Sequence, residues 1–164
     1  MIVKLNKKDI KLAHKVASQR NSSQRGARRS DGKVMRSSIN ADQIGAEGEL
    51  AVSKGLGAEW DGKFYPIEEW DKWKVDGHDV GMLEVRTTRY KTGRLIIHDK
   101  DQDYSPYILV LSYNCPEFFL AGWCFGNFGK NKKYWREDVP RPCYMVPQSD
   151  LRPMDELINF CGEN

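Results

Sequence analysis

The sequence has few cysteines, no long apolar run and no apolar leader. Its four cysteines (Cys115, Cys124, Cys143 and Cys161) lie far apart and form no CxxC pair, so neither a zinc site nor a disulfide framework is predicted. No stretch approaches the roughly 18 apolar residues of a membrane span, and the charged start MIVKLNKKDIKLAHK is unlike a signal peptide. We therefore expect a cytoplasmic protein without a membrane partner, whose thiols are buried or idle.

Charge is distributed unevenly along the 164 residues. Residues 1–40 hold eleven Lys or Arg and two acids, a balance of +9, whereas the rest hold 15 bases and 21 acids, a balance of −6. A basic arm on an acidic body favours a polyanionic partner for the arm and cations for the acids, although a solvated tail has the same composition. The candidate phosphate contacts in the arm are Arg20, Arg25, Arg28, Arg29, Lys33 and Arg36.

Helices are predicted near both ends of the chain, with strands between them. A helix is expected over residues 7–20, followed by a polar loop over 19–33. A second helix is expected from Asn40, with a capping-box pattern, to Gly55. Gly45 and Gly48 lie on one face of this helix and suggest a close approach to another element, since glycine costs helix stability.

Later segments complete the predicted fold. Strand candidates are 63–67, 77–80, 82–88, 94–98, 107–113, 117–124 and 143–146, and residues 149–160 predict a C-terminal helix. Residues 126–133 are expected to form a basic hairpin turn and lack the spacing of a phosphate-binding Walker loop. With 40% hydrophobic and 11% aromatic residues, this order indicates one α/β domain with a mixed central sheet flanked by helices.

The most informative segment is VDGHDVGMLEVRTTRY, residues 75–90. On a strand, Glu84 and Arg86 share one face, while Leu83 and Val85 point to the other. The short segment between Asp79 and Glu84 is able to bend so that the two carboxylates converge. Their mutual repulsion would be relieved by a divalent cation.

Carboxylate oxygens suit a hard cation that assists phosphodiester hydrolysis. Mg²⁺ takes oxygen ligands and commonly only one or two carboxylates, and it polarises a phosphoryl oxygen and acidifies a bound water. Asp79 and Glu84 provide that pair, with the backbone carbonyl of Val85 as a natural third ligand. Arg86 is placed to orient water or to offset charge on the phosphate.

These residues resemble the PD-(D/E)XK nuclease superfamily. The resemblance consists of Gly45-x-x-Gly48-Glu49-x-Ala51-Val52, then Asp79, then Glu84-Val85-Arg86, and it covers roughly residues 41–113. The superfamily includes Holliday-junction resolvases, many restriction enzymes and phage exonucleases, with a sheet flanked by helices and a requirement for Mg²⁺ or Mn²⁺. The resemblance implies Asp79 and Glu84 as metal ligands, Glu49 as an accessory acid, and a nuclease-like domain over 41–164 behind the basic arm of 1–40.

The sequence departs from the family pattern at two positions. Arg86 stands where the family has a lysine, and arginine is a permanent cation that cannot act as a general base. Gly77-His78 precedes Asp79 where the signature has a proline. Arginine still stabilises charge and positions water, so this departure does not exclude an active site.

Several nearby residues have alternative interpretations. Glu47 lies about 200° from Glu49 around the helix and is expected to be a solvated charge. His78 is either a catalytic base or phosphate contact, or an ordinary histidine in a surface turn. Lys100 either replaces the missing lysine or belongs to a polar loop at the end of a strand. Arg89, Lys91 and Arg94 suit either nucleic-acid contact or an ordinary hairpin. The tryptophans are expected mostly to pack in the core, and among them Trp70 and Trp73 are the better candidates for stacking on an unpaired base.

The resulting hypothesis is a Mg²⁺- or Mn²⁺-dependent deoxyribonuclease, with DNA as partner and a possible homodimer. Catalytic roles are predicted for Asp79, Glu84, Arg86 and Glu49, with metal ligation by Asp79, Glu84, Val85 and Glu49. The chain is similar in style to small phage nucleases, which would place it in the host cytoplasm. The alternatives are a nucleic-acid-binding protein of the same fold with an inactive site, and a phage-type adaptor or inhibitor that binds another protein.

Overall fold

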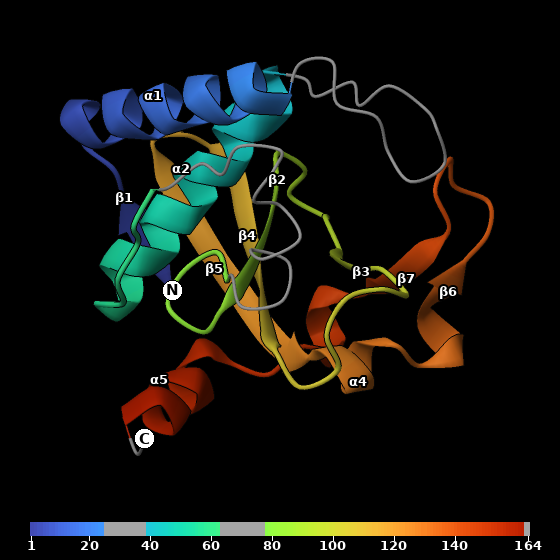
Figure 1. Cartoon of the computed structure of the whole chain (residues 1–164). Helices are drawn as coiled ribbons and strands as arrows, with labels where there is room; N and C mark the ends of the chain where they lie inside the picture. Colours follow the sequence, from blue (N-terminus) through green and yellow to red (C-terminus); the bar gives the residue numbers. More distant parts are fainter. Residues whose placement is uncertain (25–38, 63–77, 163–164) are drawn as a thin grey trace.

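A mixed four-stranded sheet lies at the centre of the computed structural model, which describes residues 1–24, 39–62 and 78–162 (Figure 1). Its long strands β4 (Pro106–Asn114) and β5 (Glu117–Phe125) pair antiparallel. β1 (Ile2–Lys4) adds antiparallel to β5, and β2 (Glu84–Thr88) adds parallel to β4, which gives the order β1-β5-β4-β2. β2 is therefore an edge strand, and one side of its backbone is available to the chain that precedes it.

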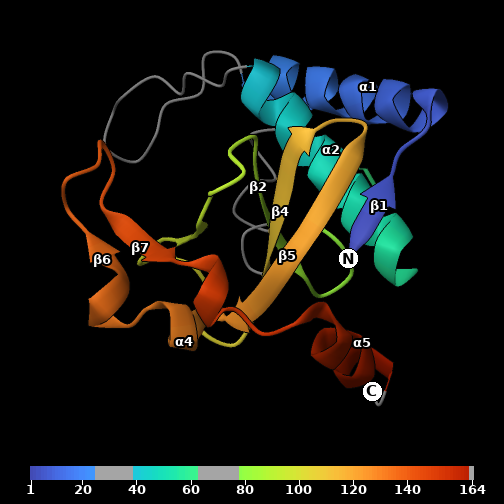
Figure 2. The same ribbon diagram turned by 180° about the vertical axis from the view of Figure 1, so that it is seen from behind.

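A smaller antiparallel sheet lies beyond one face of the central sheet. It has the order β3 (Leu95–Ile97), β7 (Cys143–Val146), β6 (Trp135–Arg136). Short helical segments connect these strands to the rest of the fold: α4 (Gly126–Gly129), η2 (Lys132–Tyr134) and η3 (Gln148–Asp150). Figure 2 shows this small sheet beside the long strands.

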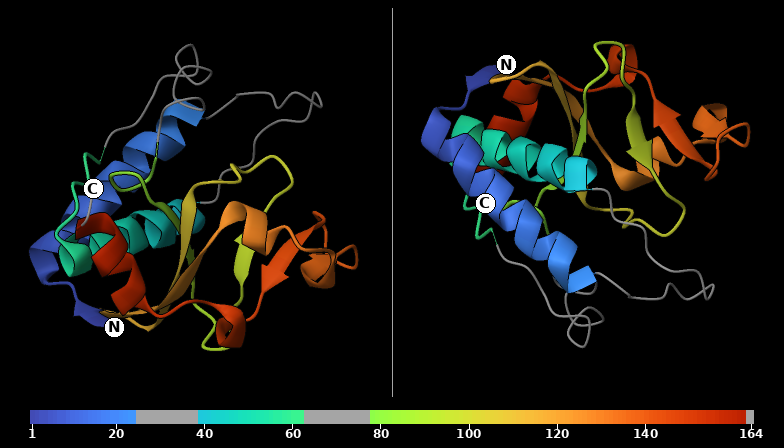
Figure 3. Two further views of the ribbon diagram at one scale, coloured as in Figure 1. Left: turned by 90° about the horizontal axis from the view of Figure 1, so that it is seen from below. Right: turned by 90° about the horizontal axis from the view of Figure 1, so that it is seen from above.

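Helices lie on the opposite side of the central sheet from the small sheet. α1 (Lys7–Gln24) lies across α2 (Ile39–Leu56), and the two views of Figure 3 place both on this side. The C-terminal helix α5 (Met154–Gly162) buries Met154 and Leu157 in the same core as α2. Within the described ranges, no helix combines the length and the apolarity needed to cross a bilayer.

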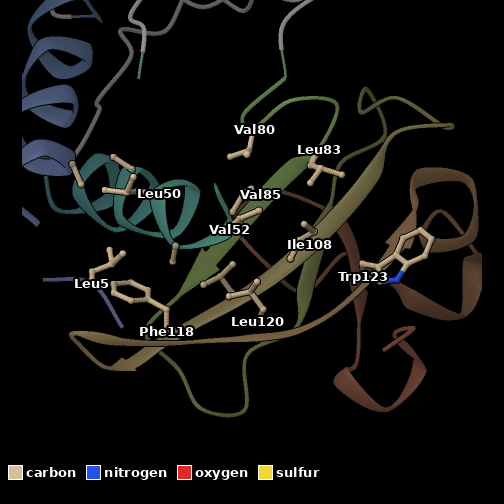
Figure 4. Packing of buried hydrophobic residues seen from close by; sticks show 14 of the residues in the cluster. Leu5, Leu50, Val52, Val80, Leu83, Val85, Ile108, Phe118, Leu120 and Trp123 are labelled. Carbon is tan, nitrogen blue, oxygen red and sulfur yellow. The ribbon is translucent and has the colours of Figure 1, made fainter. Parts of the chain in front are cut away.

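β4 is buried on both faces, which explains its almost continuous apolar sequence. Ile108 and Val110 belong to the core beneath α2. Figure 4 shows Ile108 in this core with Leu50 and Val85. The alternate residues Tyr107, Leu109 and Leu111 pack in a second core that also contains Leu95 and Ile97 from β3. Each fully buried side chain of this size contributes about 1.5–3 kcal/mol, so the paired cores fix β2 and its neighbouring loops in place.

α2 crosses β2 at very close range. A Cβ atom on Gly48 would collide with Thr87 Oγ1, whereas a Cβ on Gly45 would meet nothing within 4 Å. The expected close approach is therefore confirmed at Gly48 but not at Gly45. It brings the helix backbone against the strand that carries Glu84 and Arg86.

The predicted α/β fold with a mixed sheet and flanking helices is confirmed, although some local predictions are wrong. α1 continues past residue 20 to Gln24. Residues 126–133 form α4 and η2 instead of a hairpin turn, and 78–80 form no strand beyond an isolated bridge between Val80 and Leu83. The candidate strand 63–67 lies outside the described residues. The short strands β1 and β6 were not expected, because two or three residues show no measurable periodicity.

Candidate active site

A tight turn before β2 places Asp79 beside the edge of that strand. The backbone N–H groups of Asp79 and Val80 both donate to the carbonyl of Leu83, each at 3.1 Å. Gly81 occupies the turn with φ +56°, a left-handed conformation that favours glycine. The chain returns so that Val85 N–H donates to Asp79 Oδ2 at 2.8 Å. The convergence predicted from the short spacing is therefore produced by a hydrogen-bonded turn.

Three of the four predicted metal ligands, namely Asp79, Glu84 and the Val85 carbonyl, have an oxygen close to one nitrogen of Arg86. Arg86 Nη1 lies 3.4 Å from Glu84 Oε2, 3.6 Å from Asp79 Oδ2 and 3.3 Å from the carbonyl oxygen of Val85. All three distances are too long for strong charge-assisted hydrogen bonds, which are about 2.7–2.9 Å. The guanidinium therefore acts as a loosely fitted positive charge at the point where the oxygens converge.

Asp101 holds the other end of the Arg86 guanidinium. Arg86 Nη2 donates to Asp101 Oδ2 at 3.1 Å, and the same oxygen accepts the backbone N–H of His98 at 2.9 Å. The guanidinium carbon also lies 5.1 Å from the ring centre of Tyr107, a cation–π distance. Lys130 Nζ donates to the backbone carbonyl of Asp101 and thereby braces this loop.

Sequence reasoning does not identify Asp101. The segment His98–Asp101 suggests a possible source of a lysine, but Lys100 is exposed and it is the acid at Asp101 that contacts Arg86. The only feature of the sequence that could have pointed to Asp101 is that it is an acid in a loop directly after a strand. Its pairing with Arg86 depends on how the β3 end packs beside β2, which the sequence does not reveal.

Glu49 faces the site but both of its oxygens are occupied. Arg20 on α1 donates Nη1 to Oε1 at 2.7 Å and Nη2 to Oε2 at 2.8 Å, a bidentate pair. Trp60 Nε1–H donates to Oε2 at 2.8 Å. The Glu49 side chain is only 8% exposed and that of Arg20 is 23% exposed. The structure thus places Arg20 on a helix against an acid, although it was predicted as part of a nucleic-acid-binding arm.

Negative charge exceeds positive charge around Asp79. Burial first, and then the negative charges of Glu49 and Glu84, raise the pKa of Asp79 to about 7, against the lowering effects of the Val85 N–H and Arg86. Burial, together with the charges of Asp101 and Glu84, also raises the pKa of the Tyr107 hydroxyl. Arg86 therefore does not fully neutralise the acids that surround it.

The donor atoms suit a hard divalent cation, although they do not form a preassembled cluster. Across 1–24, 39–62 and 78–162, no three His, Cys, Asp or Glu side chains are grouped closely enough to hold a metal ion. Two carboxylates and one backbone carbonyl are nevertheless the chemistry that Mg²⁺ accepts, with water and substrate oxygens completing the shell. The excess negative charge at Asp79 fits such an ion at Asp79, Glu84 and the Val85 carbonyl, while both oxygens of Glu49 accept hydrogen bonds from Arg20 or Trp60.

Other predicted residues occupy varied positions. His78 is half-buried and its Nδ1 lies 3.2 Å from Glu84 Oε1, so it belongs to the site. The prediction that Glu47 is solvated is wrong, because it is 5% exposed and bonds His14 Nε2 at 2.7 Å. Arg89 and Lys91 are exposed in the loop after β2. Arg25, Arg28, Arg29, Lys33, Arg36, Trp70 and Trp73 lie outside the described residues.

Cys124 and Cys143 are free and buried, and Cys115 is free and exposed.

Comparisons of the chain with protein-family models, with curated proteins and with solved structures find no match.

Proposed function

We propose that the chain is a metal-dependent nuclease that hydrolyses DNA phosphodiester bonds on a restriction-endonuclease-like core. The observation that supports this most directly is the convergence of Asp79, Glu84 and the Val85 carbonyl around a single cationic nitrogen, at 3.3–3.6 Å. The PD-(D/E)XK resemblance supports the same site from the sequence. A mixed sheet with α2 packed against the strand that carries Glu84 is the architecture this proposal requires.

Asp79, Glu84 and the Val85 carbonyl would hold Mg²⁺ or Mn²⁺ in this proposal. The bound ion would supply positive charge to a phosphoryl oxygen and lower the pKa of a water molecule. For the ion to bind, Asp79 must be ionised and the Arg86 Nη1 contacts with Asp79 and Glu84 must open. Asp101, which holds Nη2, gives the guanidinium an anchor outside the ligand set.

Arg86 would act as an electrostatic residue toward the substrate. Its permanent charge excludes a role as general base, and the fixed guanidinium suits a phosphate oxygen whose negative charge increases during hydrolysis. His78, whose Nδ1 lies 3.2 Å from Glu84 Oε1, would act as a base or contact the phosphate. Glu49 would position Arg20 and Trp60 around the site.

Cleavage of labelled DNA tests the proposal. Linear, circular and branched DNA are incubated with Mg²⁺, Mn²⁺ or EDTA and with the wild type, Glu84→Gln or Glu156→Gln. Glu156 is an exposed acid on α5 and serves as the matched control. We expect metal-dependent cleavage by the wild type and by Glu156→Gln. The cleavage rate of Glu84→Gln should be at least about a hundredfold lower, since loss of one electrostatic group in an active site commonly reduces the rate that much. Equal activity of Glu84→Gln and wild type would refute the assignment.

A second candidate is a nucleic-acid-binding protein with the same site in an inactive form. It is favoured by the Arg86 guanidinium at the point of convergence and by the full pairing of Glu49. This candidate predicts salt-sensitive DNA binding with no cleavage by the wild type on any of the three DNA forms with either metal. Cleavage that appears only in Arg86→Lys would identify the arginine as the cause of inactivity.

A further inference from the structure

The loop between β2 and β3, residues 89–94, is an ordered structure. Gly93 N–H donates to the carbonyl of Tyr90 at 2.9 Å, and a Cβ on Gly93 would collide with Thr88. Gln148 Nε2 donates to the carbonyls of Lys91 and Gly93 at 3.0 and 2.9 Å. These hydrogen bonds fix the shape of the loop, so a ligand that binds there meets a preorganised surface.

The cations of this loop differ from those in the candidate active site. Arg89, Lys91 and Arg94 are all exposed or half-exposed, and none forms an ion pair with an acid among the described residues. By contrast, Arg20 pairs with the buried acid Glu49 and Arg86 pairs with the half-buried acid Asp101. Three neighbouring cations without acidic partners in the described ranges provide a local positive surface for a polyanion.

Aromatic rings lie beside these cations. Tyr90 is 76% exposed at the start of the turn in this loop, and Tyr113 is 48% exposed near the end of β4. Lys91 Nζ lies 5.8 Å from the centre of the Tyr113 ring, so the loop and the end of β4 form one surface. Exposed rings next to cations bind unpaired bases by stacking, while the cations contact the phosphates.

We propose that Tyr90, Tyr113, Arg89, Lys91 and Arg94, here called the loop surface, bind a single-stranded nucleic acid. A duplex keeps its bases stacked internally, so exposed tyrosine rings favour an unpaired strand. Arg89 directly follows β2 and lies five residues after Glu84, the first residue of that strand, which is about 17 Å of chain at 3.3 Å per residue. If the chain is the nuclease proposed above, the loop surface holds an unpaired strand at that distance from the reacting phosphate. The binding itself does not depend on that activity.

Binding measured in EDTA separates the two proposals. The probes are fluorescein-labelled oligothymidylate and oligouridylate of about 20 nucleotides, longer than a single site of this kind, and a DNA duplex of the same length. The proteins are the wild type, Tyr90→Ala, Tyr90→Phe, Tyr113→Ala and the control Tyr104→Ala, whose ring is 84% exposed outside the loop surface. Since Tyr90 and Tyr113 are exposed, their replacement leaves the core intact.

We expect Tyr90→Ala and Tyr113→Ala each to weaken binding of a single strand at least about fivefold, the lower limit for loss of one stacked base. Tyr90→Phe and Tyr104→Ala should keep wild-type affinity, and duplex binding should change less than about twofold. Replacing Arg89, Lys91 and Arg94 by Gln should reduce the salt slope of single-strand affinity by about 2, at about 0.7 for each phosphate contact. The two single-stranded probes separate DNA from RNA as the natural ligand.

Three results would overturn the loop surface as a binding site. They are failure of the wild type to bind either single strand, wild-type affinity in both tyrosine variants, and equal losses for the duplex and the single strand. Wild-type affinity in the tyrosine variants together with metal-dependent DNA cleavage would reject the loop surface and leave the nuclease in place. Selective loss of single-strand binding without any cleavage would support the loop surface and reject the nuclease.

Discussion

Replacing Asp79 by asparagine should remove a pH-dependent cost to stability. In the folded protein the pKa of Asp79 is raised from 3.8 to about 7, by burial first and then by Glu49 and Glu84. A raised carboxyl pKa means that the folded state binds a proton that the unfolded state has released. Stability from this group is therefore complete below about pH 4 and is lost as pH rises through 7.

The magnitude follows from the size of the shift. A difference of about three pKa units corresponds to about 4 kcal/mol, and the Asp79 side chain is only 16% exposed, so solvent screening is limited. In the Asp79→Asn variant, the side-chain amide would keep an oxygen acceptor for the Val85 N–H without the buried charge. The stability of Asp79→Asn relative to wild type should therefore rise by up to about 4 kcal/mol between about pH 4 and pH 8.

Urea unfolding in EDTA, followed by circular dichroism at several pH values, measures this difference. Asp99→Asn, which changes an exposed acid in the loop after β3, is the matched control and should track the wild type. A difference between Asp79→Asn and wild type that stays constant with pH would refute the reasoning. So would a difference that falls as pH rises, since it would mean that ionised Asp79 is stabilised by its surroundings.

Three further predictions concern α2 and the arginines. Gly48→Ala should lower the free energy of unfolding by about 1–3 kcal/mol in urea, because the methyl group collides with Thr87; full wild-type stability would contradict the close approach. Arg20→Met should lower the free energy of unfolding by about 3 kcal/mol, because Glu49 is left buried without its cation. A double-mutant cycle with Glu49→Gln should show strong coupling, and additive effects of the two substitutions would contradict the ion pair. Arg86→Gln should increase Mn²⁺ affinity on the order of tenfold in calorimetry, because the guanidinium charge no longer competes with the ion for the carboxylate oxygens. Unchanged affinity would mean that Arg86 does not occupy the metal position.

Local patterns are sufficient to predict the central elements of the fold. β4 and β5 are long apolar runs, and α2 has a capping pattern with a terminal glycine, so both kinds of element follow from short-range chemistry. The shared face of Glu84 and Arg86 follows from strand periodicity alone. These features do not depend on how distant segments meet.

Contacts between distant segments are beyond such patterns. Arg20 reaches Glu49 because α1 crosses α2, and Asp101 reaches Arg86 because the loop after β3 packs beside β2. Glu47 was predicted to be solvated because it lies opposite Glu49, but α1 covers that side of the helix and supplies His14. Tertiary packing therefore decides which charges are buried, and it does so with side chains far away in the sequence.

The most direct test of the account is Mn²⁺ binding to the purified protein by electron paramagnetic resonance, in the wild type, Glu84→Gln and Glu156→Gln. The convergence of Asp79, Glu84 and the Val85 carbonyl predicts a site in the wild type and Glu156→Gln that is lost or weakened at least about tenfold in Glu84→Gln. Absence of Mn²⁺ binding by the wild type, or equal binding by all three proteins, would contradict the assignment of these oxygens as a metal site.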